Sequence, residues 1–270
     1  MKFAICNEIF ERWPWERLCE HTAKLGYQGL EVAPFTLADD PASITRETRS
    51  DVRECAERHG LEILGLHWLL VKPPGLYITH PDPFTRRRTG QYFGRLVDLC
   101  ADLGGKVMVI GSPKQRNLMT GVNKEQAIGY AKEVFTPCLD QAAGRGVTLA
   151  LEPLSSIETN FIQTAQEAID LIEQINHPNF RLNLDVKAMS SERKPIPQII
   201  RDSRKHIAHV QVNDPNLQGP GMGEVKFEPI IAALREVGYD GWLSVEAFDL
   251  KQGAETIAQK SISYLKKVTS

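Results

Sequence analysis

Eight short apolar runs, spread over the whole chain, restrict its fold more than any other feature of the sequence. Amphipathic segments separate these runs, and the clearest is 227–237, where Ile230, Leu234 and Val237 recur at helical spacing. The runs lie at 2–7, 29–33, 62–67, 106–111, 147–152, 180–185, 207–212 and 242–247. Strict alternation of strands and helices predicts a parallel sheet. Eight repeats without a linker favour one α/β domain over residues 1–270, a closed (β/α)8 barrel of the TIM-barrel type.

Residues that start and stop helices agree with this division. Asn123 with Gln126, and Thr164 with Glu167, have capping-box spacing at predicted helix starts. Glycines stand between a predicted helix and the following strand, where a left-handed cap favours glycine. They are Gly26, Gly60, Gly104, Gly146 and Gly238.

Charge and cysteine content narrow the classes of function. The formal net charge of -2 gives no basic surface for nucleic acid and no polybasic arm for a membrane. No stretch approaches the roughly 20 apolar residues of a membrane span. The 5 cysteines include no CxxC pair, which indicates a reducing compartment. We therefore expect a cytoplasmic protein, compatible with a homo-oligomer, whose partner is a small molecule.

Polar residues end four predicted strands in the second half of the chain. They are Glu152, Asp185, Gln211 and Glu246. Because side chains alternate along a strand, small or polar residues share their face and large aliphatic residues occupy the other. Active sites of such barrels lie at the carboxyl ends of the strands. We therefore expect the four polar side chains to converge in the mouth of the barrel.

Three carboxylates in one poorly hydrated cavity repel one another and lose solvation. A single acidic residue at a strand end is more often a helix cap or an ion-pair partner. Four polar strand ends in matching register instead favour a site for one divalent metal ion, which removes the repulsion. Carboxylates with an amide oxygen form the oxygen-rich site that Mg²⁺ or Mn²⁺ prefers, ahead of Co²⁺ and Zn²⁺.

Several short motifs make the chain similar to a known family. They are Leu151-Glu152-Pro153-Leu154 with Glu158-Thr159, Asn183-Leu184-Asp185, His209-Val210-Gln211-Val212-Asn213-Asp214, Gly219-Pro220-Gly221-Met222-Gly223 and Ser244-Val245-Glu246. In this order they resemble the xylose-isomerase-like barrel superfamily, especially its sugar isomerase and epimerase branch. The resemblance covers nearly the whole chain and says little about the substrate.

The resemblance implies a role for each strand end. Glu152, Asp185, Gln211 and Glu246 match the family's metal ligands, and Glu152 and Glu246 also match the carboxylates that move protons on opposite faces of the substrate. The implied reaction is isomerisation or epimerisation of a small sugar or sugar-like hydroxy-ketone through a metal-stabilised cis-enediolate. The epimerases usually have histidine where Gln211 stands, whereas hydroxypyruvate isomerase resembles this sequence in using glutamine. An amide oxygen in place of an imidazole biases the site away from zinc.

Two pairs of residues near strand ends are candidates for substrate binding. His67 and Trp68 end the third predicted strand, where they fit either a wall against a sugar or a buried structural pair. Lys114 and Arg116 follow the fourth strand and fit either a site for a substrate phosphate or carboxylate, or solvated loop charges.

Two more candidates come from the resemblance. Glu158 matches a substrate-contact position of the family. Ala188 stands where the epimerases carry a histidine near the reactive end of the substrate, and Lys187 lies beside it. This departure weakens the inference to the epimerases' own substrates.

Three other functions stay open at this point. A metal-dependent dehydratase or lyase acting on a keto-inositol would use the same enolate chemistry. An abasic-site endonuclease shares the barrel but needs a histidine-rich zinc site, and Ala188 and Gln211 stand where histidines would help. A binding barrel without catalysis is the third, and the intact pair of Glu152 and Glu246 argues against it.

Overall fold

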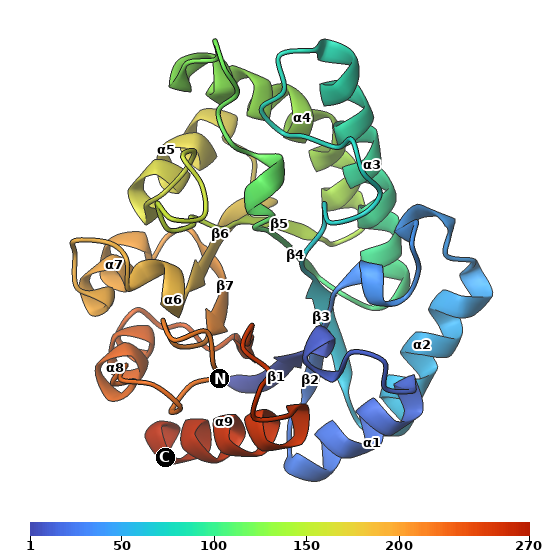
Figure 1. The fold of residues 1–270 in the computed structure, drawn as a ribbon, viewed down its shortest axis with the longest axis vertical. Coiled ribbons are helices and arrows are strands. Elements are labelled where there is room, and N and C mark those ends of the chain that lie inside the picture. Colours follow the sequence, from blue (N-terminus) through green and yellow to red (C-terminus); the bar gives the residue numbers. More distant parts are fainter.

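The parallel barrel predicted from the sequence is confirmed. Over residues 1–270, which the computed structural model describes with the exception of the Ala42 side chain, eight strands close in chain order (Figure 1). The strands are β1 (Lys2–Cys6), β2 (Gly29–Val32), β3 (Glu62–Leu66), β4 (Val107–Ile110), β5 (Thr148–Leu151), β6 (Phe180–Asp185), β7 (Ile207–Val212) and β8 (Trp242–Val245). Parallel pairing of β1 with β8 closes the barrel.

The α-helices form a ring outside the strands (Figure 1). They are α1 (Trp15–Leu25), α2 (Arg46–Arg58), α3 (Pro83–Asp102), α4 (Lys124–Gly144), α5 (Ala165–Ile175), α6 (Val186–Met189), α7 (Ile196–Ser203), α8 (Glu228–Glu236) and α9 (Ala254–Thr269). Short 3₁₀ segments, η1 (Asn7–Phe10), η2 (Pro34–Thr36), η3 (Pro41–Ser43) and η4 (Pro113–Gln115), lie in the loops that follow β1, β2 and β4. Among the described residues, no helix is both long and apolar enough to cross a membrane.

The predicted helix boundaries follow the expected local chemistry. All five glycines expected at helix ends have positive φ, between 69° at Gly146 and 92° at Gly26. The capping box of Asn123 and Gln126 is complete at the start of α4. Before α5 only half of the predicted box forms: Thr164 accepts from the Glu167 amide, but the Glu167 carboxylate accepts from the amide of Gln163.

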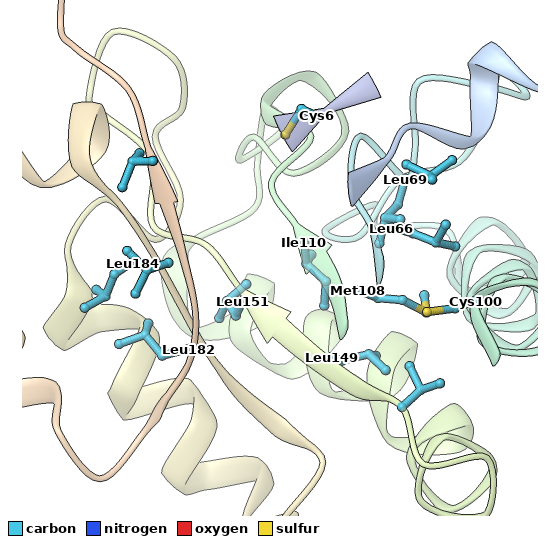
Figure 2. Packing of buried hydrophobic residues seen from close by; sticks show 14 of the residues in the cluster. Cys6, Leu66, Leu69, Cys100, Met108, Ile110, Leu149, Leu151, Leu182 and Leu184 are labelled. Atoms are coloured by element: carbon cyan, nitrogen blue, oxygen red, sulfur yellow. The ribbon is translucent and has the colours of Figure 1, made fainter. Parts of the chain in front are cut away.

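The two faces of each strand separate as predicted. Leu149 and Leu151 of β5, with Leu182 and Leu184 of β6, pack in the main hydrophobic core outside the barrel (Figure 2). Inside the barrel a separate small cluster contains Ala4, Leu64, Val107 and Ala150. The barrel interior is therefore apolar where Ala150 lies, and polar residues follow it toward the strand ends.

Most strands are one or two residues shorter than the sequence predicts. β5 stops at Leu151 and β8 at Val245, so Glu152 and Glu246 are the first residues beyond their strands. Asp185 and Gln211 instead remain within β6 and β7, whose predicted bounds are correct. The ladder ends earlier in β5 and β8 because the chain turns there into loops that line the barrel mouth.

Candidate active site

A polar layer crosses the interior of the barrel and consists of Glu31, Asn183, His209 and Gln211. Glu31 has no exposed surface; its Oε2 lies 3.1 Å from His209 Nε2, and its Oε1 accepts from Gln211 Nε2 at 3.3 Å. Asn183 Nδ2 donates to Gln211 Oε1 at 2.7 Å. Burial by itself would raise the pKa of Glu31, but His209, His67 and Ser244 together outweigh it and bring that pKa down to about 2. The layer thus holds a buried carboxylate together with the groups that stabilise its charge.

A cavity of about 410 Å³ opens at the carboxyl ends of the strands. It brings together eight of the ten predicted site residues: His67, Trp68, Lys114, Glu152, Glu158, Lys187, Gln211 and Glu246. Asp185 is buried beside this cavity and affects the titration of Glu152. Arg116 does not line the cavity, and its position is described below.

Asp185 is the most firmly held of the three mouth carboxylates, a name used here for Glu152, Asp185 and Glu246. Its Oδ1 accepts from the Ala188 amide at 2.8 Å and caps α6, and its Oδ2 accepts from Asn213 Nδ2 at 2.6 Å. Burial and then the charge of Glu246 raise the pKa of Asp185 to about 7, despite these donors.

Glu152 is buried where other negative charges surround it. Burial, followed by the charges of Asp185 and Glu246, raises its pKa well above the ordinary value for glutamate. A Cβ atom on Gly111 would lie 2.5 Å from Glu152 Oε2, so only glycine leaves room for the carboxylate in this position. The fold therefore keeps a protonatable carboxyl group and space around it in the wall of the cavity.

Glu246 is held by two side chains from the end of β3. Trp68 Nε1 donates to its Oε1 at 3.0 Å, and His67 Nδ1 lies 3.4 Å from the same oxygen. His67 Nε2 in turn lies 2.9 Å from Glu8 Oε2. Trp68 adopts a left-handed conformation, φ 54°, which is uncommon for a bulky residue and is found at functional sites. The predicted His67–Trp68 wall is thus tied directly to Glu246.

Lys187 and Glu158 form an ion pair in the same cavity, with Lys187 Nζ 2.6 Å from Glu158 Oε1. Burial opposes the charge of Lys187, but the nearby carboxylates of Asp185 and Glu158 raise its pKa above the ordinary lysine value. Its ammonium group also lies 4.6 Å from the centre of the Phe248 ring. A cation and an aromatic face therefore adjoin the mouth carboxylates.

The two predicted residues after β4 have different positions. Lys114 is exposed at the rim of the cavity. Arg116 is 1% exposed, and its guanidinium donates to backbone carbonyls of the loops after β4 and β5, with the shortest bond, 2.7 Å, to Glu152 O. We therefore correct the prediction that Arg116 binds a charged group of the substrate. Its guanidinium is already hydrogen-bonded to backbone carbonyls, and the bond to Glu152 O holds the backbone of Glu152 in place.

Three residues that contact the site were not among the predicted ones. Glu8 holds His67, Asn213 holds Asp185, and Phe248 lies against Lys187. Each lies one to three residues beyond a strand, where the alternation of side chains no longer tells which way a residue points. For Glu8 and Phe248 this position was the only signal in the sequence, whereas Asn213 also lies in one of the motifs that carry the family resemblance.

The closed parallel barrel has buried carboxylates at the carboxyl ends of its strands. This is the end at which TIM-barrel enzymes have their active sites. The model described as the xylose isomerase-like TIM barrel matches residues 19–268, and the chain belongs to that family.

Known relatives extend along most of the chain. The D-psicose 3-epimerase of Ruminiclostridium cellulolyticum is 26% identical over 260 residues, which is 92% of this chain and 84% of the relative. The inosose isomerase of Bacillus velezensis is 25% identical over 245 residues, 86% of this chain and 81% of the relative. A solved structure of D-psicose 3-epimerase with D-tagatose, from Clostridium cellulolyticum, superimposes with a TM-score of 0.88 at 21% identity and covers 100% of both chains.

Proposed function

We propose that this protein is a divalent-metal-dependent isomerase or epimerase of a small keto-sugar, with Glu152 and Glu246 as its proton-transfer pair. The observation that carries the proposal is the convergence of the mouth carboxylates beside one cavity of about 410 Å³. The names of the relatives, ketose 3-epimerases and an inosose isomerase, support the reaction class and a carbohydrate substrate.

The donor atoms at the mouth fit a hard divalent cation. The proposed ligands are Glu152, Asp185, Gln211 and Glu246, which offer three carboxylates and one amide oxygen. The Gln211 oxygen accepts from Asn183 and keeps a second lone pair. The upward pKa shifts of Glu152 and Asp185 are what a site built for a cation is expected to have when protein charges alone surround it. Mn²⁺ and Mg²⁺ are the proposed ions, and an oxygen-rich set disfavours Zn²⁺.

A cation bound there would supply Lewis-acid stabilisation of the negative charge that builds on the substrate's oxygens when a carbon-bound proton leaves. The chain's own residues then have to remove and return that proton. Glu152 and Glu246 follow β5 and β8, three strands apart around the barrel, so their carboxyl groups approach a substrate in the cavity from different sides. In an epimerisation one removes the proton from carbon and the other delivers a proton to the opposite face.

The surroundings of Glu152 and Glu246 support separate roles for the two carboxyl groups in proton transfer. Glu246 is oriented by Trp68 and His67, and Glu8 fixes the far nitrogen of the His67 ring. Glu152 lies beside Asp185 and Glu246, whose negative charges a bound cation would offset. The neighbours of the two carboxyl groups thus differ, which is the usual basis for separate acid and base roles.

Substrate contacts are proposed for the remaining lining residues. Lys187 and Glu158 can exchange part of their mutual ion pair for hydrogen bonds to hydroxyl or carbonyl oxygens. The ring of Trp68 lies 6.1 Å from that of Phe248, and the two provide apolar surface for the carbon face of a sugar. Lys114 at the rim can meet a charged group at the far end of the substrate.

The test is a panel of ketoses, aldoses and keto-inositols incubated with the enzyme and Mn²⁺ in D₂O. We expect one of them to isomerise or epimerise and to gain deuterium on the carbon next to the carbonyl group. Loss of water from a keto-inositol, without a sugar isomer as product, would assign the dehydratase reaction instead. Binding of a sugar with neither product nor deuterium exchange would contradict the catalytic proposal.

A further inference from the structure

A second group of metal-binding side chains lies away from the barrel mouth, between the neighbouring helices α1 and α2 of the outer ring (Figure 1). Its members are Glu16 of α1, Cys55 of α2 and His59, the C-cap of α2. Cys55 and His59 are four residues apart and therefore lie on one face of their helix. One ligand atom from each of the three residues lies within 4.8 Å of the others.

The contacts within this group converge on the Glu16 carboxylate. Cys55 Sγ donates to Oε2 at 3.1 Å, and His59 Nε2 lies 2.8 Å from Oε1. Ligands around a tetrahedral ion with bonds of about 2.0–2.3 Å are roughly 3.3–3.8 Å apart. Small side-chain movements would therefore open the group enough to admit an ion, with no change in either helix.

Access and charge also suit an ion. The Cys55 thiol is buried at 5% exposure, whereas the Glu16 side chain is 60% exposed, so the group is open on its outer side. A glutamate in contact with solvent is ionised at neutral pH and can bind a cation. Arg58 Nη2, 2.9 Å from Glu16 Oε2, can keep its hydrogen bond while the carboxylate binds a metal, as outer donors commonly do.

We propose that Glu16, Cys55 and His59 bind one Zn²⁺ ion, with solvent as the fourth ligand, and that this ion ties α1 to α2. One sulfur, one imidazole nitrogen and one carboxylate oxygen form a mixed set of the kind that zinc accepts. The Cys55 thiol loses its proton to solvent when the sulfur binds, so binding releases a proton. This site differs in chemistry from the oxygen-rich mouth and adds stability without taking part in the reaction.

The test is a titration of the chelator-treated full-length protein with Co²⁺, a spectroscopic substitute for Zn²⁺. A thiolate ligand gives a sulfur-to-cobalt charge-transfer band in the near ultraviolet, which an all-oxygen site cannot give. We expect the band in the wild type and its loss in C55S and H59Q. We also expect Zn²⁺ to remove the band by displacing Co²⁺ and to raise the melting temperature of the wild type but less that of C55S.

Two variants serve as controls. Cys19 lies against Cys55 without being one of the three ligands, so C19S should keep the band. Cys6 lies 3.8 Å from His67 inside the barrel, and C6S should also keep it. Absence of the band in the wild type, its persistence in C55S, or its loss in C6S or C19S would overturn the proposal. Turnover of C55S should equal that of the wild type, whichever substrate the mouth accepts.

Discussion

Buried carboxylates in two parts of the same barrel have pKa values that are shifted in opposite directions. In the polar layer, His209, His67 and Ser244 bring the pKa of the single carboxylate, Glu31, to about 2. At the mouth, burial and mutual repulsion raise the pKa of Asp185 to about 7 and that of Glu152 well above its ordinary value. Other groups of the chain stabilise the charge of Glu31, whereas the mouth has more negative charge than Lys187 balances. Under the proposed function, Glu31 is therefore a structural residue, and a cation from outside offsets the charge of the mouth.

The largest expected effect is on turnover, when either proton-transfer group is neutralised. E152Q and E246Q keep the shape and one oxygen ligand but remove the base or acid, so kcat should fall on the order of 10²- to 10⁴-fold. Steady-state kinetics with saturating Mn²⁺ measures this. Near-normal turnover in both variants, with metal still bound, would assign the chemistry to other residues even though the fold stands.

The corresponding substitution in the polar layer, E31Q, should lower the stability of the protein rather than its turnover. E31Q replaces the buried carboxylate that lies beside His209 Nε2 and accepts from Gln211, and it should lower the free energy of unfolding by about 1–3 kcal/mol. Denaturant unfolding measures the loss, and kcat of the folded variant should change less than about tenfold. A fall in kcat as large as that of E152Q, at unchanged stability, would erase the distinction between the two groups.

The pH dependence of stability tests the same difference between Glu31 and the mouth carboxylates, with a smaller expected effect. Asp185 holds its proton in the folded protein up to a pKa of about 7, against an ordinary value of 3.8, so stability of the metal-free protein should fall as pH rises between these values. Glu31 acts in the opposite sense, because its stabilising charge is lost as pH falls from 4.5 toward 2. Mn²⁺ at 100 times the Kd that it has at pH 8 should add about 2.7 kcal/mol at pH 8. The same concentration should add less at pH 5, where protons compete with Mn²⁺ for the carboxylates. Melting curves with and without Mn²⁺ at pH 5 and pH 8 check this, and an equal or smaller gain at pH 8 would contradict it.

The smallest expected effects concern the two lysines of the cavity. K187M removes a buried cation from the mouth and should raise KM by about tenfold, the usual scale of a charged hydrogen bond. K114A removes an exposed cation at the rim and should change KM for a neutral sugar by less than about threefold. A comparison of neutral and phosphorylated or acidic substrates measures both. If K114A acts equally on the two kinds of substrate, Lys114 is a solvated surface residue.

The barrel and most of its mouth could be predicted from the sequence because both depend on periodicity. Alternation along β5 and β8 assigns Glu152 and Glu246 to the inner face, and the repeat of strand and helix brings the ends together. Glu8 lies two residues and Arg116 six residues beyond the end of its strand, and there the path of the loop decides where the side chain points. Arg116 points into the protein and binds backbone carbonyls, and Glu8 points inward and contacts His67. Contacts between helices, such as Glu16 with Cys55, likewise depend on how the outer ring packs.

The proposed metal site at the mouth is tested most directly by the number of Mn²⁺ ions bound per chain at pH 8, measured by equilibrium dialysis after exhaustive chelation. Mn²⁺ is chosen because it prefers the oxygen ligands of the mouth over the thiol of Cys55. We expect one ion in the wild type and in E31Q, and binding weakened by at least about tenfold in D185N and E246Q. No bound Mn²⁺ in the wild type, or full binding in both D185N and E246Q, would contradict the claim that the mouth carboxylates hold a cation.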